Sequence, residues 1–315
     1  MARLVTLGML NLSLKVVSIE ERRSDILRMV EEAGRGGCQI VMIPEFADHH
    51  RTHESHANYG KVGIDEYRKV VGLRYDSPFM TALAALARKH NMVVIPDVLL
   101  LEKGRASNTC VVYGPEGSVL GTYSKVHLAP GECDVFEGGT QIATVATPYG
   151  KLGLLICYDI NFPELTRCYE LLGAELLLWT TMRQAELEDG HYRARLPGRC
   201  IDHGLPLGVA TYVSDDQLLM RASMSSAVFN ALGQVAGGGL MTPGVVRGTV
   251  DLDARPLERR SWANPEWLDS ASYLRRRRRP ELYGAITRPL TKDEANPENE
   301  PTLVPKTLTK FQSLG

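Results

Sequence analysis

The chain has 315 residues, of which 44% are hydrophobic and 23% are charged, as in an ordinary globular protein. This length can hold one large domain or two ordinary ones, and it is ample for a buried core. The 36 basic and 37 acidic residues give a net charge of -1, so the composition gives no reason to expect nucleic acid or an anionic membrane surface as a partner. A small neutral substrate fits the composition better.

The first twelve residues are apolar but alternate in character, and they lack the small-residue cleavage pattern of a signal peptide. They predict a first strand. No apolar run reaches the length that a membrane-spanning helix requires. Six cysteines are scattered without CxxC pairs, which argues against a zinc site or a disulfide framework and favours a reducing, cytoplasmic setting.

Apolar spacing predicts strands and helices that alternate along the chain, with hairpins between them. Strands are expected at 4–12, 39–43, 92–101, 176–180, 206–212, 223–230 and 245–250, helices at 18–33, 77–90, 162–172 and 187–202, and hairpins at 107–124 and 142–156. The helix at 187–202 is expected to be interrupted near Pro197. The segment 48–75 predicts a loop with a short helix.

The order of these elements indicates an α/β layered fold with a mixed sheet, and the number of strands suggests two sheets face to face. A dinucleotide-binding fold is disfavoured, because no GxGxxG follows the first strand. No domain boundary is expected before about residue 253, so the first domain covers 1–253. The extension at 254–315 contains five consecutive arginines, 275–279, and predicts a subunit-contacting arm or a flexible tail.

Cys157 lies where a short apolar strand, 152–156, runs into a helix. Asn161 is expected to cap that helix, with Pro163 in its first turn. A thiol at a helix N-terminus is in a positive field, which is expected to lower its pKa and favour the thiolate. For a lone cysteine, however, the more common explanation is a small hydrophobic residue at a strand end.

Two further residues share this placement, because Glu45 and Lys125 also follow apolar strands. In α/β layers, ligand-binding and catalytic residues are often found at the carboxyl ends of the strands. Each alone could be a solvated surface residue. Together they supply what acyl transfer at an amide or nitrile carbon needs: Cys157 attacks, a carboxylate moves its proton to the leaving amine, and a fixed cation balances the oxyanion.

Three segments then establish a resemblance to the nitrilase superfamily of carbon-nitrogen hydrolases. They are residues 41–46 (Val-Met-Ile-Pro-Glu-Phe), 123–128 (Tyr-Ser-Lys-Val-His-Leu) and 157–167 (Cys-Tyr-Asp-Ile-Asn-Phe-Pro-Glu-Leu-Thr-Arg), in the family's chain order. The resemblance runs from about Leu4 to Asp253. It implies a four-layer α-β-β-α sandwich with two mixed sheets that pairs through its helical faces, and hence a homo-oligomer.

The resemblance also implies roles for individual residues. Glu45 would be the general base, Lys125 the oxyanion partner and Cys157 the nucleophile, with the backbone N–H of Tyr158 completing the oxyanion hole. A second glutamate follows the lysine in this family, and Glu132 is the best match.

Alternatives remain open around these roles. Glu137 is a weaker candidate for the second glutamate, and Glu132 itself could be a plain loop carboxylate. No metal or organic cofactor is implied, because the residues named for the reaction need none. The histidines at 49, 50, 53 and 56 lie on no recognisable helix face, so they predict a solvated loop near the site entrance and not a metal site.

The residues after the cysteine resemble the amidase and carbamoylase branches more than true nitrilases. The expected reaction is therefore hydrolysis of a small amide or an N-carbamoyl compound through a thioester or carbamoyl enzyme, with release of ammonia. A nitrilase and a catalytically inactive scaffold or binding protein remain the alternatives.

The pocket wall is expected to include Phe46, Tyr158, Thr181, Met182 and Arg183. Arg183 and Arg199 could bind a substrate carboxylate. For Arg199 a structural role is favoured, because arginines are common near helix ends.

Overall fold

The computed structural model describes residues 2–50, 52–54, 64–182, 189–213, 225–240, 242–259 and 267–292. The chain divides into two compact units, Met1–Ala271 and Ser272–Gly315. The first unit carries the sheets and all of the predicted site residues. The domain division expected at residue 253 stays a prediction.

Thirteen strands of the described residues join into one curled sheet system, and two more form a small ribbon. The strands are β1 (Leu4–Ser13), β2 (Ile40–Met42), β3 (Val93–Ile95), β4 (Asp97–Glu102), β5 (Arg105–Tyr113), β6 (Val119–Ser124), β7 (Val145–Thr147), β8 (Gly150–Ile156), β9 (Leu176–Thr180), β10 (Leu207–Val213), β11 (Ala227–Phe229), β12 (Val235–Gly237), β13 (Gly244–Asp251), β14 (Leu257–Arg259) and β15 (Trp267–Asp269).

The long strand β1 connects the two halves of this system. Its first part pairs with β2 in parallel and with β13 in antiparallel, whereas its last three residues pair in parallel with β10. The order along the main path is β4-β5-β3-β2-β1-β10-β9-β8-β7. One half therefore holds β1 to β6 with β13, and the other holds β7 to β12.

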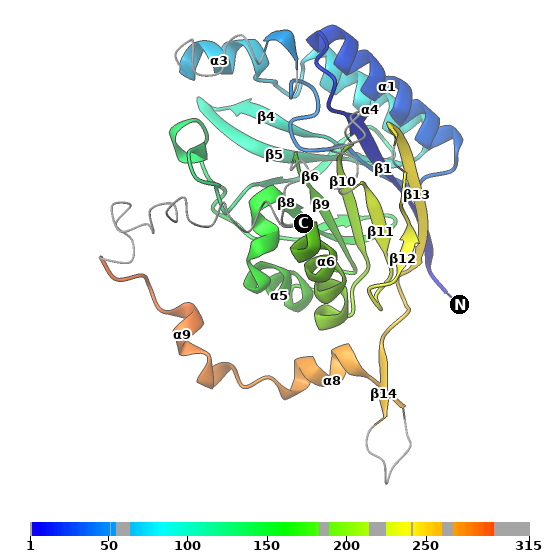
Figure 1. Cartoon of the computed structure of the whole chain (residues 1–315), viewed down its shortest axis with the longest axis vertical. Coiled ribbons are helices and arrows are strands. Elements are labelled where there is room, and N and C mark those ends of the chain that lie inside the picture. Colours follow the sequence, from blue (N-terminus) through cyan, green and yellow to red (C-terminus); the bar gives the residue numbers. More distant parts are fainter. Residues whose placement is uncertain are drawn as a thin grey trace, which may run out of the picture. The chain divides into compact units, whose positions relative to one another are not determined.

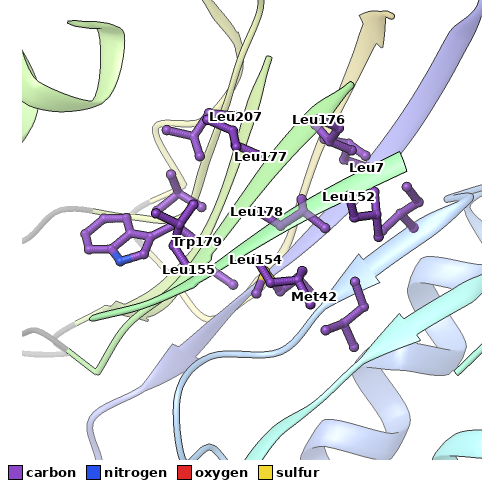
Figure 2. Packing of buried hydrophobic residues seen from close by; sticks show 14 of the residues in the cluster. Leu7, Met42, Leu152, Leu154, Leu155, Leu176, Leu177, Leu178, Trp179 and Leu207 are labelled. Carbon is purple, nitrogen blue, oxygen red and sulfur yellow. The ribbon is translucent and has the colours of Figure 1, made fainter. Parts of the chain in front are cut away.

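The two halves bury their apolar side chains against each other. Strands β2 and β9 are buried along their whole length, which is the pattern of strands covered on both faces. Figure 2 shows Leu7 and Met42 of the first half in one cluster with Leu152, Leu154 and Leu178 of the second. This shared core makes the fold a sandwich.

The helices among the described residues are α1 (Ile19–Arg35), α3 (Ile64–Val71), α4 (Pro78–His90), α5 (Pro163–Leu171), α6 (Asp189–His203), α8 (Ser270–Arg277) and α9 (Gly284–Thr287). In the first unit, four of them cover the outer faces of the sheets. α1 and α4 pack on the first half, and α5 and α6 pack on the second (Figure 1). The resulting α-β-β-α layering confirms the expected fold. Among the described helices, none has both the length and the apolar run needed to cross a bilayer.

Three local expectations were wrong. The strand expected at 92–101 is divided into β3 and β4 at Pro96, which has no N–H to continue the ladder. α6 passes through Pro197 without interruption. Asn161 does not cap α5, because Cys157–Asn161 forms a 3-10 turn of its own and Phe162 is the capping position, with Pro163 in the first turn as expected.

Candidate active site

Glu45 lies just beyond β2 and is fully buried. Both of its carboxylate oxygens accept hydrogen bonds. Its Oε1 accepts hydrogen bonds from Nδ2 of Asn108 at 2.8 Å and from Nζ of Lys125 at 3.2 Å. Its Oε2 accepts from the backbone N–H of Met182 at 2.9 Å. These donors come from β5, from the end of β6 and from the segment after β9, so three separate parts of the chain hold one carboxylate.

Lys125 connects Glu45 to a second glutamate. Its Nζ donates to Oε1 of Glu132 at 2.8 Å, while Oε2 of Glu132 accepts from the backbone N–H of Ala129 at 2.7 Å. Burial lowers the pKa of Lys125, but the charges of Glu45, Cys157 and Glu132 outweigh it and the pKa is raised overall. Lys125 is therefore a buried, permanent cation.

The structure separates the two candidates for the second glutamate. Glu132 contacts Lys125, and burial, together with the nearby charge of Glu45, raises its pKa. Glu137 instead pairs with Arg105 at 2.6 Å in an exposed ion pair. Geometry thus favours Glu132.

Cys157 is at the start of the 3-10 turn after β8, with a left-handed φ of 46°. The thiol is within hydrogen-bonding reach of Thr181 and feels the charges of Glu45 and Lys125. Burial is the largest cause that raises the pKa of Cys157, Glu45 raises it further, and the opposing effect of Lys125 is smaller. The expectation of a lowered thiol pKa was wrong, because desolvation and a neighbouring carboxylate outweigh the helix field.

Asp159 fixes the turn that presents the cysteine. One oxygen accepts from the hydroxyl of Tyr123 at 2.7 Å and from the backbone N–H of Ile156 at 3.0 Å. The other is bound by His127, through its backbone N–H at 3.0 Å and its Nδ1 at 2.8 Å. The buried Asp159 thus joins the strand before Cys157 to the segment after Lys125.

The predicted pocket residues have different surroundings. Phe46 is buried and packs against the ring of Phe136. Thr181 is buried at the thiol, and Met182 reaches Glu45 through its backbone. Tyr158 stands edge-on to Phe162. Arg183 lies outside the described residues.

The segment after Glu45 is only in part the solvated loop that was expected, because His53 is exposed but His49 is buried. Asp48 and His49 are buried, and their side chains contact each other at 2.9 Å. Arg23 on α1 donates to the second oxygen of Asp48 at 3.0 Å, so a salt bridge draws this segment against the helix layer. His56 lies outside the described residues.

Arg199 on α6 donates to the backbone oxygen of Ile160 at 3.1 Å. It therefore ties α6 to the turn that follows Cys157. This contact accords with the structural role favoured for Arg199.

Sequence reasoning missed three residues that contact Glu45 or its peptide group: Asn108, Asp97 and Tyr212. A signal existed for Asp97, because it follows the apolar run 92–96 just as Glu45 follows its own strand. Asn108 is a polar residue at a position of β5 whose neighbours on the same face, Ala106 and Cys110, are buried. Nothing in the local sequence distinguishes Tyr212 from a core aromatic residue.

Comparison with known proteins identifies the family to which the chain belongs. The model of the carbon-nitrogen hydrolase family matches residues 3–256. The omega-amidase NIT2 of Bos taurus is 30% identical over 236 residues, which cover 71% of this chain and 81% of that protein. The omega-amidase NIT2 of Danio rerio is 28% identical over 234 residues, covering 71% and 80%.

Solved structures of similar fold agree. A carbon-nitrogen hydrolase from Helicobacter pylori G27 superimposes with a TM-score of 0.72 at 22% identity, covering 91% of this chain and 99% of that one. An amidase from Nesterenkonia sp. gives a TM-score of 0.66 at 22% identity, covering 90% and 96%. With a family model that spans most of its length, the chain belongs to the carbon-nitrogen hydrolases and is an enzyme of that family.

Proposed function

We propose that this enzyme hydrolyses a small carboxamide to the carboxylic acid and ammonia, through a thioester on Cys157. The observation that carries the proposal is the hydrogen-bonded chain of Glu45, Lys125 and Glu132, which lies beside a thiol whose pKa is raised. A thiol in that state is a poor nucleophile without a base, and Glu45 is the carboxylate next to it.

In the acylation step, Sγ of Cys157 attacks the amide carbon while Glu45 takes the thiol proton. The resulting oxyanion is stabilised by Lys125 and by the backbone N–H of Tyr158, which lies in the first turn of the 3-10 segment, where N–H groups lack partners within the turn. Glu45 then returns the proton to the leaving nitrogen, the carbon-nitrogen bond breaks, and ammonia departs.

In the deacylation step, a water molecule attacks the thioester and Glu45 accepts its proton. The carbon-sulfur bond breaks, the proton passes to the sulfur, and the acid leaves. Glu132 shares the charge of Lys125 and keeps its ammonium group in place. Phe46, Thr181 and Met182 supply the wall of the pocket, and no cofactor takes part.

An amide substrate is favoured over a nitrile because the matched relatives are named as amidases. An N-carbamoyl compound fits the same steps. A nitrile would need the same thiol, so the two are compared by assay: matched amide, carbamoyl and nitrile substrates should release ammonia fastest from the amide.

Replacing Cys157 tests the proposal directly. Cys157→Ala should lower ammonia release by at least about 10⁴-fold, because the nucleophile is lost while the fold is kept. Cys133→Ala is the matched control, since Cys133 is exposed and should leave the rate unchanged. Unaltered ammonia release from Cys157→Ala would refute the thioester and favour an inactive scaffold with a contaminating activity.

We further propose that the enzyme is a cytoplasmic homo-oligomer without nucleic-acid or membrane partners. All six cysteines are free thiols, as suits a reducing compartment. The second unit exposes apolar side chains, including Leu282, Ile286 and Leu290, which a further subunit would cover. Light scattering of the full chain should give a multiple of 34.8 kDa, and a monomer would oppose the proposal.

A further inference from the structure

The peptide group between Glu45 and Phe46 is held on both sides by buried side chains. Its carbonyl oxygen accepts a hydrogen bond from the hydroxyl of Tyr212 at 2.8 Å. Its N–H donates to Oδ1 of Asp97 at 3.2 Å. Tyr212 belongs to β10 and Asp97 to β4, so the two contacts come from opposite halves of the sheet system.

This peptide group needs such support because of the backbone that follows it. Phe46 has a φ of 51°, in the left-handed region that bulky residues rarely occupy. Conformations of this kind cost free energy and persist only where the surroundings fix them. Tyr212 and Asp97 are themselves buried, at 1% and 0% exposure, so water cannot replace either contact.

We propose that Tyr212 and Asp97 are positioning residues that clamp the Glu45–Phe46 peptide and thereby aim the carboxylate of Glu45 at Cys157. The inference rests on the proposed role of Glu45 as the base. Neither residue touches the reacting atoms. Both act through the plane of one peptide bond, because a rotation of that plane would move the Glu45 side chain away from Lys125 and the thiol.

The raised pKa of Asp97 suggests a variant that separates its charge from its role as a hydrogen-bond acceptor. Burial, and after it the charge of Glu45, raises the pKa of Asp97 well above its ordinary value. Burial thus disfavours a charge at this position, while the N–H of Phe46 needs an oxygen acceptor. Asp97→Asn supplies an uncharged oxygen acceptor, whereas Asp97→Ala removes the acceptor.

The experiment combines Tyr212→Phe, Asp97→Ala, Asp97→Asn and the double variant Tyr212→Phe with Asp97→Ala. Tyr212→Phe removes one hydroxyl and keeps the ring that packs on His50. We expect kcat to fall about tenfold in Tyr212→Phe and in Asp97→Ala, with KM changed by less than about twofold. Asp97→Asn should stay within about threefold of the parent, and the double variant should lose little more than the worse single one, because both changes release the same peptide.

A second readout does not depend on substrate. The rate of alkylation of Cys157 by iodoacetamide at pH 7 should fall by the same factor as kcat in Tyr212→Phe and Asp97→Ala, since the thiol relies on an aimed base. Tyr149→Phe is the control: its hydroxyl donates to the backbone oxygen of Asn91, a contact away from the Glu45 peptide and from the cysteine turn. That control should leave the alkylation rate unchanged.

The clamp would be overturned by unchanged alkylation in Tyr212→Phe, by losses that multiply in the double variant, or by an equal loss in Tyr149→Phe. Urea unfolding of each variant identifies any variant that fails to fold. If Asp97→Ala does not fold, the comparison of Tyr212→Phe with Asp97→Asn is enough to test the clamp. If no amide is hydrolysed, alkylation alone still decides the clamp. Failure of the proposed function and failure of the clamp are thus read from different measurements.

Discussion

The turn that carries Glu45 and the turn that carries Cys157 are stabilised by different kinds of contact. Each follows a buried strand, in opposite halves of the sheet system, and each contains a non-glycine residue with positive φ: Phe46 at 51° and Cys157 at 46°. The cysteine turn takes much of its support from Asp159, two residues further on, which binds the N–H of Ile156. The glutamate turn takes its side-chain support from residues at least 51 positions away, the nearest being Asp97.

The difference explains how each half of the site depends on the rest of the molecule. The cysteine turn has a local hydrogen bond between Asp159 and Ile156 in addition to the distant contacts of Asp159 with Tyr123 and His127. A turn supported by β4, β5, β10 and the segment after β9 has its geometry only after both halves of the sandwich have assembled. Variants at the glutamate turn and at the cysteine turn should therefore differ in how much they change kcat relative to the free energy of unfolding.

The largest effect is expected from Glu45→Gln. Glutamine cannot accept the thiol proton, and the raised pKa of Cys157 leaves little thiolate without a base, so kcat should fall by about 10³-fold or more. Ammonia release and alkylation of Cys157 should fall together. Glu137→Gln, at an exposed ion pair, is the control. A loss of less than about tenfold in Glu45→Gln would remove Glu45 from the role of base.

Lys125→Met should come next. It removes the cation between Glu45 and Glu132 and leaves one buried and one partly buried carboxylate unbalanced, so we expect the unfolding free energy to fall by about 3–5 kcal/mol. Loss of oxyanion stabilisation should lower kcat by about 10²-fold. Lys103→Met, at an exposed side chain, should change neither quantity. Unaltered urea unfolding of Lys125→Met would show that the buried charges are not coupled.

A smaller effect on catalysis is expected from Asp159→Asn. The new amide would face the donors Tyr123 and Ile156, so the cysteine turn should loosen, with kcat about tenfold lower and stability lower by about 1–3 kcal/mol. Steady-state rates and urea unfolding measure the two. Asp134→Asn, on the surface, is the control. If both quantities kept the parent values, local support of the cysteine turn would be wrong.

The smallest effect is one of pH. The pKa of Asp97 is raised in the folded state by burial and then by Glu45, so the folded protein binds a proton that the unfolded chain releases at lower pH. Stability should therefore fall as pH rises from the ordinary carboxyl range toward the raised pKa. Asp97→Asn removes that contribution and should flatten the slope in urea unfolding between pH 5 and pH 8. An unchanged slope would mean that Asp97 is ionised in the folded protein.

Sequence reasoning succeeded where short-range patterns decide structure. The continuous apolar runs of β2, β8 and β9 and the stripe on α1 predicted these elements closely, because burial on a fixed face repeats with a fixed period. Helix α5 was displaced at its start, since the carboxylate of Asp159 stabilises an extra turn before it. The thiol pKa was predicted with the wrong sign, because its main cause is burial by distant parts of the chain.

The sequence alone determined the layered α/β fold and the three strand ends that carry Glu45, Lys125 and Cys157, because each depends on a local run of residues. Only the tertiary structure brought Asn108, Asp97 and Tyr212 to the Glu45 turn. Their contacts join strands that are far apart in the chain, and no period or motif records which side chains of two strands will meet. Assembly of the sandwich decides those neighbours, and the burial that comes with it raises the pKa of the Cys157 thiol.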